Sequence, residues 1–328
     1  MRLVSFELST PLGPMVRIGA VLSDGRYADL QLAYRAHLAD KGAASKEGAA
    51  RLAAASLPTD MVALIENGAF GLDAARTALD WVAANGDISI DGGHLVQEPG
   101  SVRLLAPIPR PPLIRDFMAF EQHLKNIYPR LGREIPPQWY EMPVYYKGNP
   151  SAAGADGDVI EMPSYAPTLD FEFEFAAVIG RGGADISRDR ATSHIFGYMI
   201  YNDFSARDIQ QREMSVGLGP AKGKDFRRAH VFGPWLVTAD EIRDVYNLGM
   251  SATVNGEPWT NSSTSTMHWR FDQMIAHAST AEMLVPGEIF GSGTVGGGSA
   301  AEVGKTLNKG DRVVLTVDGL GTLSNTVG

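Results

Sequence analysis

Acidic side chains alternate with phenylalanines in the segment LDFEFEFAAVIG, residues 169–180. An extended strand has a side-chain period of two, so Glu172 and Glu174 share one face with their Cα atoms about 7 Å apart. The apolar run AAVIG predicts that the strand continues into the core. Carboxylates this close in a partly buried place raise one another's pKa unless a cation neutralises them, which suggests half of a cation site. Asp170, the first acid of the row, is assigned to the strand entrance. The segment alone also fits an edge strand with a solvated acidic face.

Two further acids end strand-like runs elsewhere in the chain. Asp203 ends the run MIYND, just before a predicted helix in SARDIQQRE, and Asp116 ends the run LIRD. Because site residues often project from the ends of strands, Asp116, Glu172, Glu174 and Asp203 could surround one cation. A ligand set made only of oxygens suits Mg²⁺ or Mn²⁺, with Ca²⁺ as a further candidate, rather than Zn²⁺.

The composition excludes several classes of protein. The 328 residues include no cysteine, which rules out disulfides, thiolate catalysis and sulfur-rich metal sites. The net charge is -9 at pH 7 and the basic residues form no block, so we expect no nucleic-acid partner. The chain has no apolar run of about 18 residues and no secretory signal pattern, which predicts a cytoplasmic protein with no membrane partner. The expected partners are a small molecule and a second copy of the chain.

The elements that must position these residues fall into two predicted domains, 1–105 and 106–328. The first begins with two or three antiparallel strands and continues with Ala- and Leu-rich helices at 43–56, 59–68 and 72–86. The proline-rich run LLAPIPRPPLIRD marks the boundary, because it fits neither a helix nor a central strand. The second domain is rich in strand-like runs with Gly or Asn turns. The predicted fold class is mixed α+β and mainly β.

The acidic motifs resemble those of the fumarylacetoacetate hydrolase family. The Glu-X-Glu strand in DFEFE is followed about thirty residues on by YNDFSARDIQ, and the likeness spans roughly residues 105–326. The resemblance implies a C-terminal β-roll or β-sandwich domain with a divalent cation at its mouth, a small N-terminal domain and a homodimer. It also implies that the metal ligands are Asp116, Glu172, Glu174 and Asp203. The motif RDFMAFEQH is more similar to the fumarylacetoacetase branch than to the smaller acylpyruvases.

The resemblance further implies a general base and several substrate contacts. His123 resembles the base that activates water; the third residue after it is Asn126, not the Glu of the smaller members, and Glu302 is the nearby candidate for its carboxylate partner. Further positions resemble substrate-binding or charge-stabilising residues of the family, namely Tyr146, Arg207, Gln210, Lys224 and Thr294. Plain structural readings remain open for four of them: ion pairs for Arg207 and Lys224, a core aromatic for Tyr146 and a turn for Thr294.

The predicted activity is hydrolysis of a carbon–carbon bond in a 1,3-diketone acid of the fumarylacetoacetate or acylpyruvate type. A divalent cation would polarise one carbonyl and stabilise the departing enolate, while His123 takes a proton from water. Decarboxylation, hydration or isomerisation of a 2-oxo acid on the same scaffold is an alternative, as is a non-catalytic protein that keeps the cation site.

Two other segments draw attention. GSGTVG, residues 291–296, formally matches the dinucleotide-binding Gly-X-Gly-X-X-Gly pattern, but fewer than forty residues follow it, too few for the rest of a Rossmann unit. It is better interpreted as a backbone wall of the pocket. The aromatic and charged segment 120–143 could be a lid that orders over substrate or an ordinary surface loop.

Overall fold

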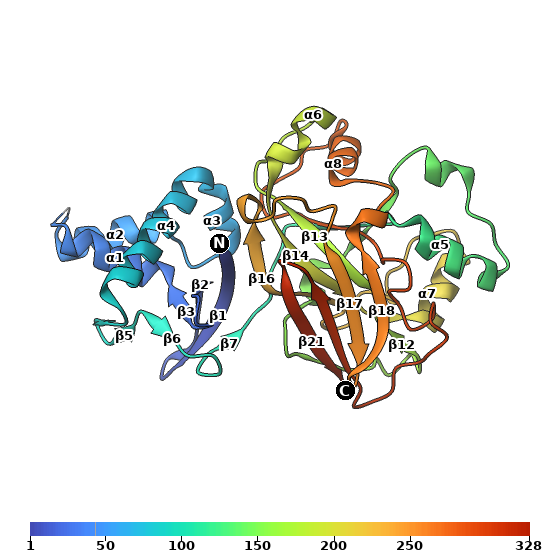
Figure 1. The fold of residues 1–328 in the computed structure, drawn as a ribbon, viewed down its shortest axis with the longest axis horizontal. Helices are drawn as coiled ribbons and strands as arrows, with labels where there is room; N and C mark the ends of the chain where they lie inside the picture. The colour runs from blue at the N-terminus through green and yellow to red at the C-terminus, as the bar shows by residue number, and fades with distance from the viewer. Residues whose placement is uncertain (43) are drawn as a thin grey trace. The chain divides into compact units, whose positions relative to one another are not determined.

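The chain divides into two compact units, Met1–Ile108 and Pro109–Gly328, in a computed structural model that describes residues 1–42 and 44–328 (Figure 1). Ala43, the first residue of the predicted helix 43–56, lies outside the described residues. Each unit has its own strands and helices, and the residues predicted to do chemistry all belong to the second unit.

The N-terminal unit is a small sheet covered by helices. Its strands β1, β2 and β3 pair antiparallel, as predicted, and β7 also pairs with β1. The strands are β1 (Arg2–Thr10), β2 (Gly13–Val21), β3 (Tyr27–Asp29), β4 (Ser89–Ile90), β5 (Gly93–His94), β6 (Val96–Gln97) and β7 (Arg103–Leu104). The helices are α1 (Leu30–Asp40), α2 (Lys46–Ser56), α3 (Met61–Glu66) and α4 (Gly68–Asn85).

Helix α1 begins at Leu30, thirteen residues before the first predicted helix, 43–56. The Asp29 carboxylate caps it by accepting the backbone N–H of Leu32 at 3.0 Å. Leu30, Ala33 and Ala36 lie buried on one side, at helical spacing. An Asp directly before an apolar run at this spacing is the signal that could have predicted the helix.

The C-terminal unit contains most of the strands. They are β8 (Ile114–Phe117), β9 (Tyr145–Gly148), β10 (Ala153–Gly154), β11 (Val159–Ile160), β12 (Leu169–Asp170), β13 (Phe173–Ile179), β14 (Ile195–Asp203), β15 (Ser205–Ala206), β16 (His230–Thr238), β17 (Gly249–Val254), β18 (Glu257–Ser263), β19 (Ile289–Gly291), β20 (Arg312–Val317) and β21 (Gly321–Val327). The α-helices are α5 (Glu121–Ile127), α6 (Arg188–Ala191), α7 (Arg207–Met214) and α8 (Phe271–Ser279). Short 3-10 turns include η1 (Pro129–Leu131) and η2 (Pro137–Tyr140).

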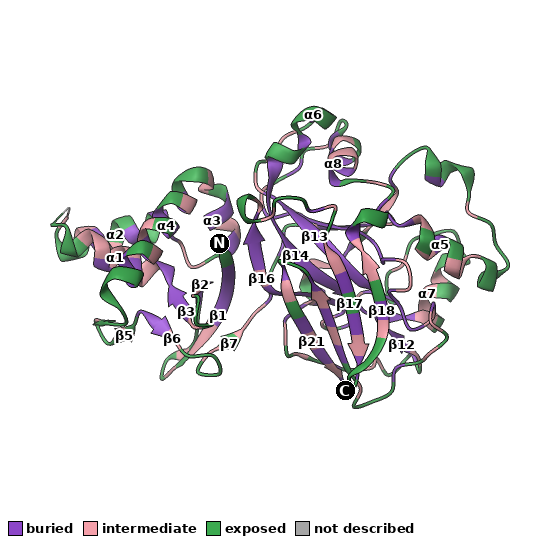
Figure 2. Cartoon of the chain, viewed as in Figure 1, coloured by how far each residue is buried: buried purple, intermediate pink, exposed green. Residues whose placement is uncertain are grey.

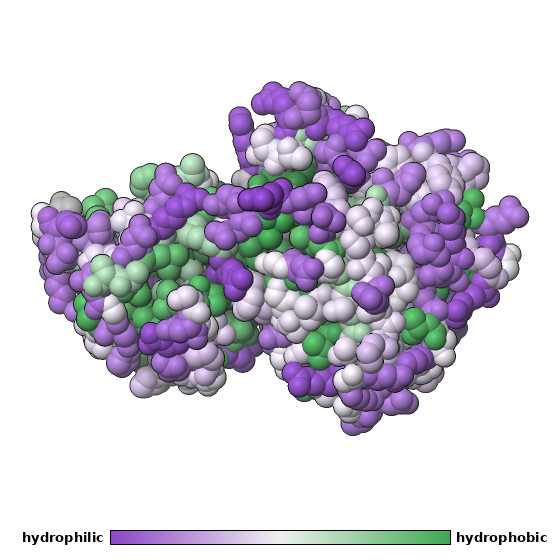
Figure 3. Space-filling model, viewed as in Figure 1, coloured by the Kyte–Doolittle hydropathy of each residue, from purple (hydrophilic) through white to green (hydrophobic). Residues whose placement is uncertain are grey.

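Most of these strands lie in two sheets that share one hydrophobic core. One contains β16-β14-β13-β19-β8-β9 in this order, with β10 paired to β16, and the other has the order β11-β21-β20-β17-β18. Strands β12 and β15 pair separately with each other. Apolar residues of both sheets belong to the same buried cluster, among them Phe173 and Phe175 of β13, Leu315 of β20 and Leu323 of β21. Figure 2 shows β13, β14 and β16 buried along their lengths, whereas the region of α5, α6 and α8 carries many hydrophilic residues in Figure 3. The predicted mixed, mainly β fold with a sandwich-like second domain is confirmed.

The acidic segment does not lie at a sheet edge. β13 pairs with β14 on one side and β19 on the other, so the solvated edge strand that the pattern alone also allowed is wrong. Every residue from Leu169 to Ile179 is buried, the acids included. Both faces of this strand are therefore covered, and its carboxylates must find partners inside the protein.

Candidate active site

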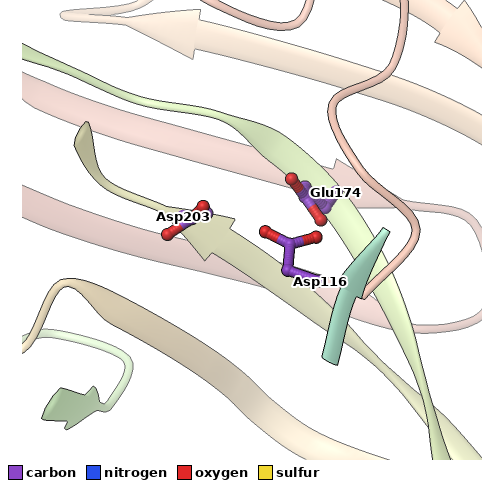
Figure 4. A group of neighbouring side chains, drawn as sticks. All are labelled: Asp116, Glu174 and Asp203. Atoms are coloured by element: carbon purple, nitrogen blue, oxygen red, sulfur yellow. The ribbon is translucent and has the colours of Figure 1, made fainter. Parts of the chain in front are cut away.

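Three of the four predicted ligands converge inside the C-terminal unit. Asp116, Glu174 and Asp203 each place a carboxylate oxygen within 4.8 Å of the others, and all three side chains are buried. Figure 4 shows the three carboxylates gathered from β8, β13 and the end of β14. The sheet creates this meeting because Glu174 pairs with Tyr201 in the β13–β14 register, and β8 joins the same sheet through β19, where Asp116 pairs with Gly291.

The electrostatics of this group fit a cation. Burial, reinforced by the nearby negative charges, raises the pKa of both Asp116 and Glu174 well above the usual range. Among the described residues, the buried Oδ1 atom of Asp116 has no hydrogen-bond partner. An unpartnered carboxylate oxygen beside two further carboxylates fits a hard divalent ion such as Mg²⁺, Mn²⁺ or Ca²⁺.

Glu172, the fourth predicted ligand, lies beside this group but holds different partners. Its carboxylate pairs with Arg207 Nη1 at 2.7 Å and with Lys224 Nζ at 2.5 Å. Burial alone would raise the pKa of Glu172, but the charges of Arg207 and Lys224 outweigh it and hold the pKa at about 2. Lys224 also contacts Asp203, so one buried ammonium joins the two carboxylates. A role for Glu172 as a metal ligand stays a prediction.

Asp203 is also held by three neighbours, of which the sequence reasoning missed His230. Although burial opposes its ionisation, Lys224 and then His230 keep the pKa of Asp203 well below the usual range. His230 Nδ1 lies 3.1 Å from Asp203 Oδ1, and Tyr146 donates its hydroxyl to Asp203 Oδ2 at 2.6 Å. Tyr146 pairs with Asp116 in the β8–β9 register, which explains why it reaches the acidic group. Its predicted contact with substrate stays a prediction.

His123 meets the carboxylate that was its candidate partner. Its Nδ1 atom lies 2.6 Å from Glu302 Oε1, although the two residues are 179 positions apart in the chain. Because an ionised carboxylate only accepts, Nδ1 carries the hydrogen, and a neutral His123 then has its lone pair on Nε2. Asn126, one helical turn after His123 on α5, donates to the other oxygen of Glu302 at 2.7 Å. Asn126 therefore binds the same carboxylate as His123.

The remaining predicted site residues lie in the same region. Arg207 Nη1 donates to Gln210 Oε1 at 3.0 Å, so these two side chains of α7 point the same way. Thr294 is buried and follows Gly293, whose N–H donates to Glu174 Oε2 at 2.8 Å. The Gln210 side chain thus contacts Arg207, and Thr294 follows directly after Gly293, which donates to Glu174.

The glycine-rich segment 291–296 lies against the acids. Gly291 has no Cβ atom, and an added one would stand 2.7 Å from Asp116 Oδ1. Gly293 has φ +79° and presents its N–H to Glu174. Ser292 exchanges backbone and side-chain hydrogen bonds with Phe175, which fixes the segment beside β13. These glycines allow the close approach of backbone to carboxylates. The role of the segment as a wall of the pocket stays a prediction.

The segment 120–143, predicted as a lid or a surface loop, is held at several places besides the contacts of His123 and Asn126 with Glu302. Arg130 donates to the carbonyl oxygens of Ala301 and Glu302 at 2.6 and 2.7 Å. Trp139, which is buried, donates its indole N–H to the carbonyl of Met118 at 2.8 Å. The segment therefore contacts the turn that carries the partner of His123.

Comparison with known proteins identifies the chain's relatives. A family profile described as "Fumarylacetoacetate (FAA) hydrolase C-terminal" matches residues 113–328. The chain belongs to this fumarylacetoacetate hydrolase family. The mitochondrial oxaloacetate tautomerase of Xenopus laevis is 32% identical over 329 residues, which cover 100% of the chain and 90% of that protein. The oxaloacetate tautomerase YisK of Bacillus subtilis is 30% identical over 277 residues, covering 83% and 88%.

A solved structure supports the fold. Maleylpyruvate hydrolase from Sphingobium sp. SYK-6, in complex with manganese(II) and pyruvate, has a TM-score of 0.68 at 22% identity, covering 100% of this chain and 98% of that one. The predicted family is confirmed, whereas the closer placement in the fumarylacetoacetase branch is not confirmed, because the relatives above carry the name oxaloacetate tautomerase. Within residues 1–42 and 44–328, no helix is both long and apolar enough to cross a membrane.

Proposed function

We propose that the protein is a divalent-cation-dependent tautomerase that interconverts the enol and keto forms of a short 2-oxo dicarboxylic acid of the oxaloacetate type. The proposal rests on one observation above all: the His123–Glu302 pair belongs to the same unit as the buried acidic group. The names of the two relatives supply the substrate class.

The cation would be Mg²⁺ or Mn²⁺, held by Asp116, Glu174 and Asp203, with Glu172 as a further ligand. When bound, it would polarise the substrate carbonyl and stabilise negative charge on its oxygen. It also offsets the charge of the site. If all are ionised, these four carboxylates carry four negative charges against the two positive charges of Arg207 and Lys224, so a dicarboxylate would otherwise be repelled.

The residues of the chain supply the proton transfer. Tautomerisation takes one proton from the enol oxygen, adds one to the carbon next to the carbonyl carbon, and consumes no water. His123 is suited to it because Glu302 occupies Nδ1 and leaves Nε2 to give or accept the proton at carbon. Arg207 with Gln210, and Lys224, are proposed to bind substrate carboxylates, and Tyr146 and Thr294 to border the substrate.

Hydrolysis of an acylpyruvate or fumarylacetoacetate-type diketone is the second candidate. The same His123–Glu302 pair could take a proton from water instead of from carbon, and a pair of this kind typically contributes about 10² to 10⁴ in rate. The difference is chemical: hydrolysis consumes water and breaks a carbon–carbon bond. The homodimer and the cytoplasmic location stay predictions.

The test follows the enol absorbance of oxaloacetate, with Mn²⁺ or Mg²⁺ and with a chelator. Because free metal ions can also catalyse enolisation, the matched controls are the ion without protein and the ion with Asp116→Asn. Acetylpyruvate and fumarylacetoacetate are run in parallel with product analysis. Faster conversion of the oxaloacetate enol only with intact protein and metal supports the proposal. Cleavage of a diketone without tautomerisation of oxaloacetate favours the second candidate, and no acceleration of any of these reactions refutes both.

A further inference from the structure

Glu302 lies in a short turn, not in a helix or strand, and hydrogen bonds from the backbone of this turn hold it in place. The turn, residues 299–302, is held from its N–H side by one buried carboxylate, that of Asp170. Asp170 Oδ1 accepts the N–H of Ala300 at 2.8 Å, and Oδ2 accepts the N–H of Ala301 at 3.2 Å. These contacts fix the backbone directly before Glu302.

The same carboxylate also binds Arg207. Nε and Nη2 of Arg207 lie 2.9 and 2.8 Å from Asp170 Oδ2, a paired contact of guanidinium and carboxylate. The strands bring them together, because β12 pairs with β15 in a register that sets Asp170 opposite Ser205, two residues before Arg207. Asp170 thus contacts both the turn of Glu302 and the guanidinium of Arg207 through one carboxylate.

We propose that Asp170 is a positioning residue that holds Glu302 against His123 and aims Arg207, so that the base and the substrate-binding arginine keep a fixed relation. This inference rests on the proposed function. The contacts explain why the sequence places a third acid in the row with Glu172 and Glu174: it binds the protein's own donors.

The chemistry of the contacts requires a carboxylate. Besides Ala300, Ala301 and Arg207, the backbone N–H of Phe171 donates to Asp170 Oδ1 at 2.8 Å. Every partner is a donor, so the amide of an asparagine would turn its own NH₂ group toward at least one N–H in either orientation. Asp170→Asn, which keeps the shape, should therefore loosen the turn or the arginine.

A matched control exists in the N-terminal unit. Asp29 is also buried, also pairs with an arginine, Arg17, through two contacts of 2.6 and 2.7 Å, and also accepts a backbone N–H, that of Leu32. Asp29→Asn makes the same chemical change without touching the turn of Glu302. A loss of stability shared by both variants reports burial alone.

The first measurement is a double-mutant cycle on kcat for the reaction in which the intact enzyme is active. Glu302→Gln should lower kcat by about 10²-fold, and Asp170→Asn by about tenfold or more. If Asp170 acts through Glu302, the double variant should match Glu302→Gln within about twofold, whereas independent effects multiply. The fold-changes in kcat caused by Asp29→Asn and by Glu302→Gln should multiply in the corresponding double variant.

The second measurement does not depend on activity. In protein with ¹⁵N-labelled histidine, the Nδ1–H resonance of His123, assigned with His123→Gln and altered by Glu302→Gln, should move in Asp170→Asn and stay in place in Asp29→Asn. If Asp170→Asn is not recovered folded, Asp170→Glu gives the same test, because it keeps the charge but not the distances to the two amides.

The outcomes separate the two proposals. An inactive intact enzyme refutes the proposed function, while the resonance still tests the role of Asp170. Multiplicative effects on kcat, or an unmoved His123 resonance in a folded Asp170 variant, overturn the positioning role even if the enzyme is an active tautomerase.

Discussion

Replacement of Gly291 by alanine tests the acidic group with the smallest possible change. Gly291 lies beside Asp116 in the β8–β19 register, and its φ is outside the left-handed region, so alanine meets no backbone strain there. Its Cβ atom would stand 2.7 Å from Asp116 Oδ1 and 2.8 Å from Cε1 of Tyr201, whereas ordinary contacts begin at 3.4 Å. The carboxylate must therefore move by about 0.7 Å, the difference between 3.4 and 2.7 Å.

A shift of this size should weaken metal binding strongly and lower the stability of the fold only modestly. Ligand distances in metal sites hold within about 0.2 Å, so we expect Mn²⁺ affinity to fall by about 10- to 100-fold, the range seen when residues that support metal ligands are changed. Overpacking should cost about 1 to 3 kcal/mol of stability. Affinity is measured by calorimetric titration with Mn²⁺, and stability by thermal unfolding in chelator.

The matched control for this prediction is Gly180→Ala. Gly180 follows β13 at the end away from Glu174, and its added Cβ would meet Phe196 Cβ at 2.9 Å, a clash of similar size away from the carboxylates. Gly180→Ala should lose stability and keep its Mn²⁺ affinity. If Gly291→Ala binds Mn²⁺ within about twofold of the unmodified protein while Gly180→Ala is equally destabilised, Asp116 is not a ligand and the reasoning fails.

Three further predictions concern the same site. Glu302→Gln should keep Mn²⁺ affinity and lose about 10²-fold in kcat, because the neutral amide cannot balance a protonated His123 and must turn its NH₂ group toward either His123 Nδ1 or the Asn126 amide; unchanged steady-state kinetics would place the base elsewhere. Arg207→Lys should raise KM by about tenfold or more, since a lysine cannot reproduce the two contacts that Arg207 makes with the Asp170 carboxylate. An unchanged KM would contradict a substrate role for Arg207. Burial and like charge raise the pKa of Asp116 and Glu174, so without metal the folded state keeps protons that the unfolded chain releases above about pH 4. Stability in chelator should therefore fall as pH rises above that value, Mn²⁺ should remove the fall, and Asp116→Asn should reduce it; a melting temperature that rises with pH equally in both proteins would count against these shifts.

Much of the site could be predicted because its residues are marked locally. Asp116 and Asp203 each end a strand, and Glu174 lies near the start of another; strand ends can be read from apolar runs and the helix signals that follow them. The alternation of DFEFE fixed which side chains share a face, and the absence of cysteine limited any metal to hard ligands. The same local reasoning missed α1, because the capping signal of Asp29 was not weighed.

The partners of these residues were decided by the tertiary structure. Glu302 reaches His123 across 179 positions, and Asp170 reaches the turn before Glu302 across 130. Such contacts depend on strand order, register and the path of turns, which a local period does not specify. The sequence by itself determined the fold class and the oxygen ligands available to a cation, and it predicted His123 as a base with Glu302 as a candidate partner. The folding of β8, β13 and β14 into one sheet decided which carboxylates meet, and the turn at 299–302 decided which carboxylate binds His123.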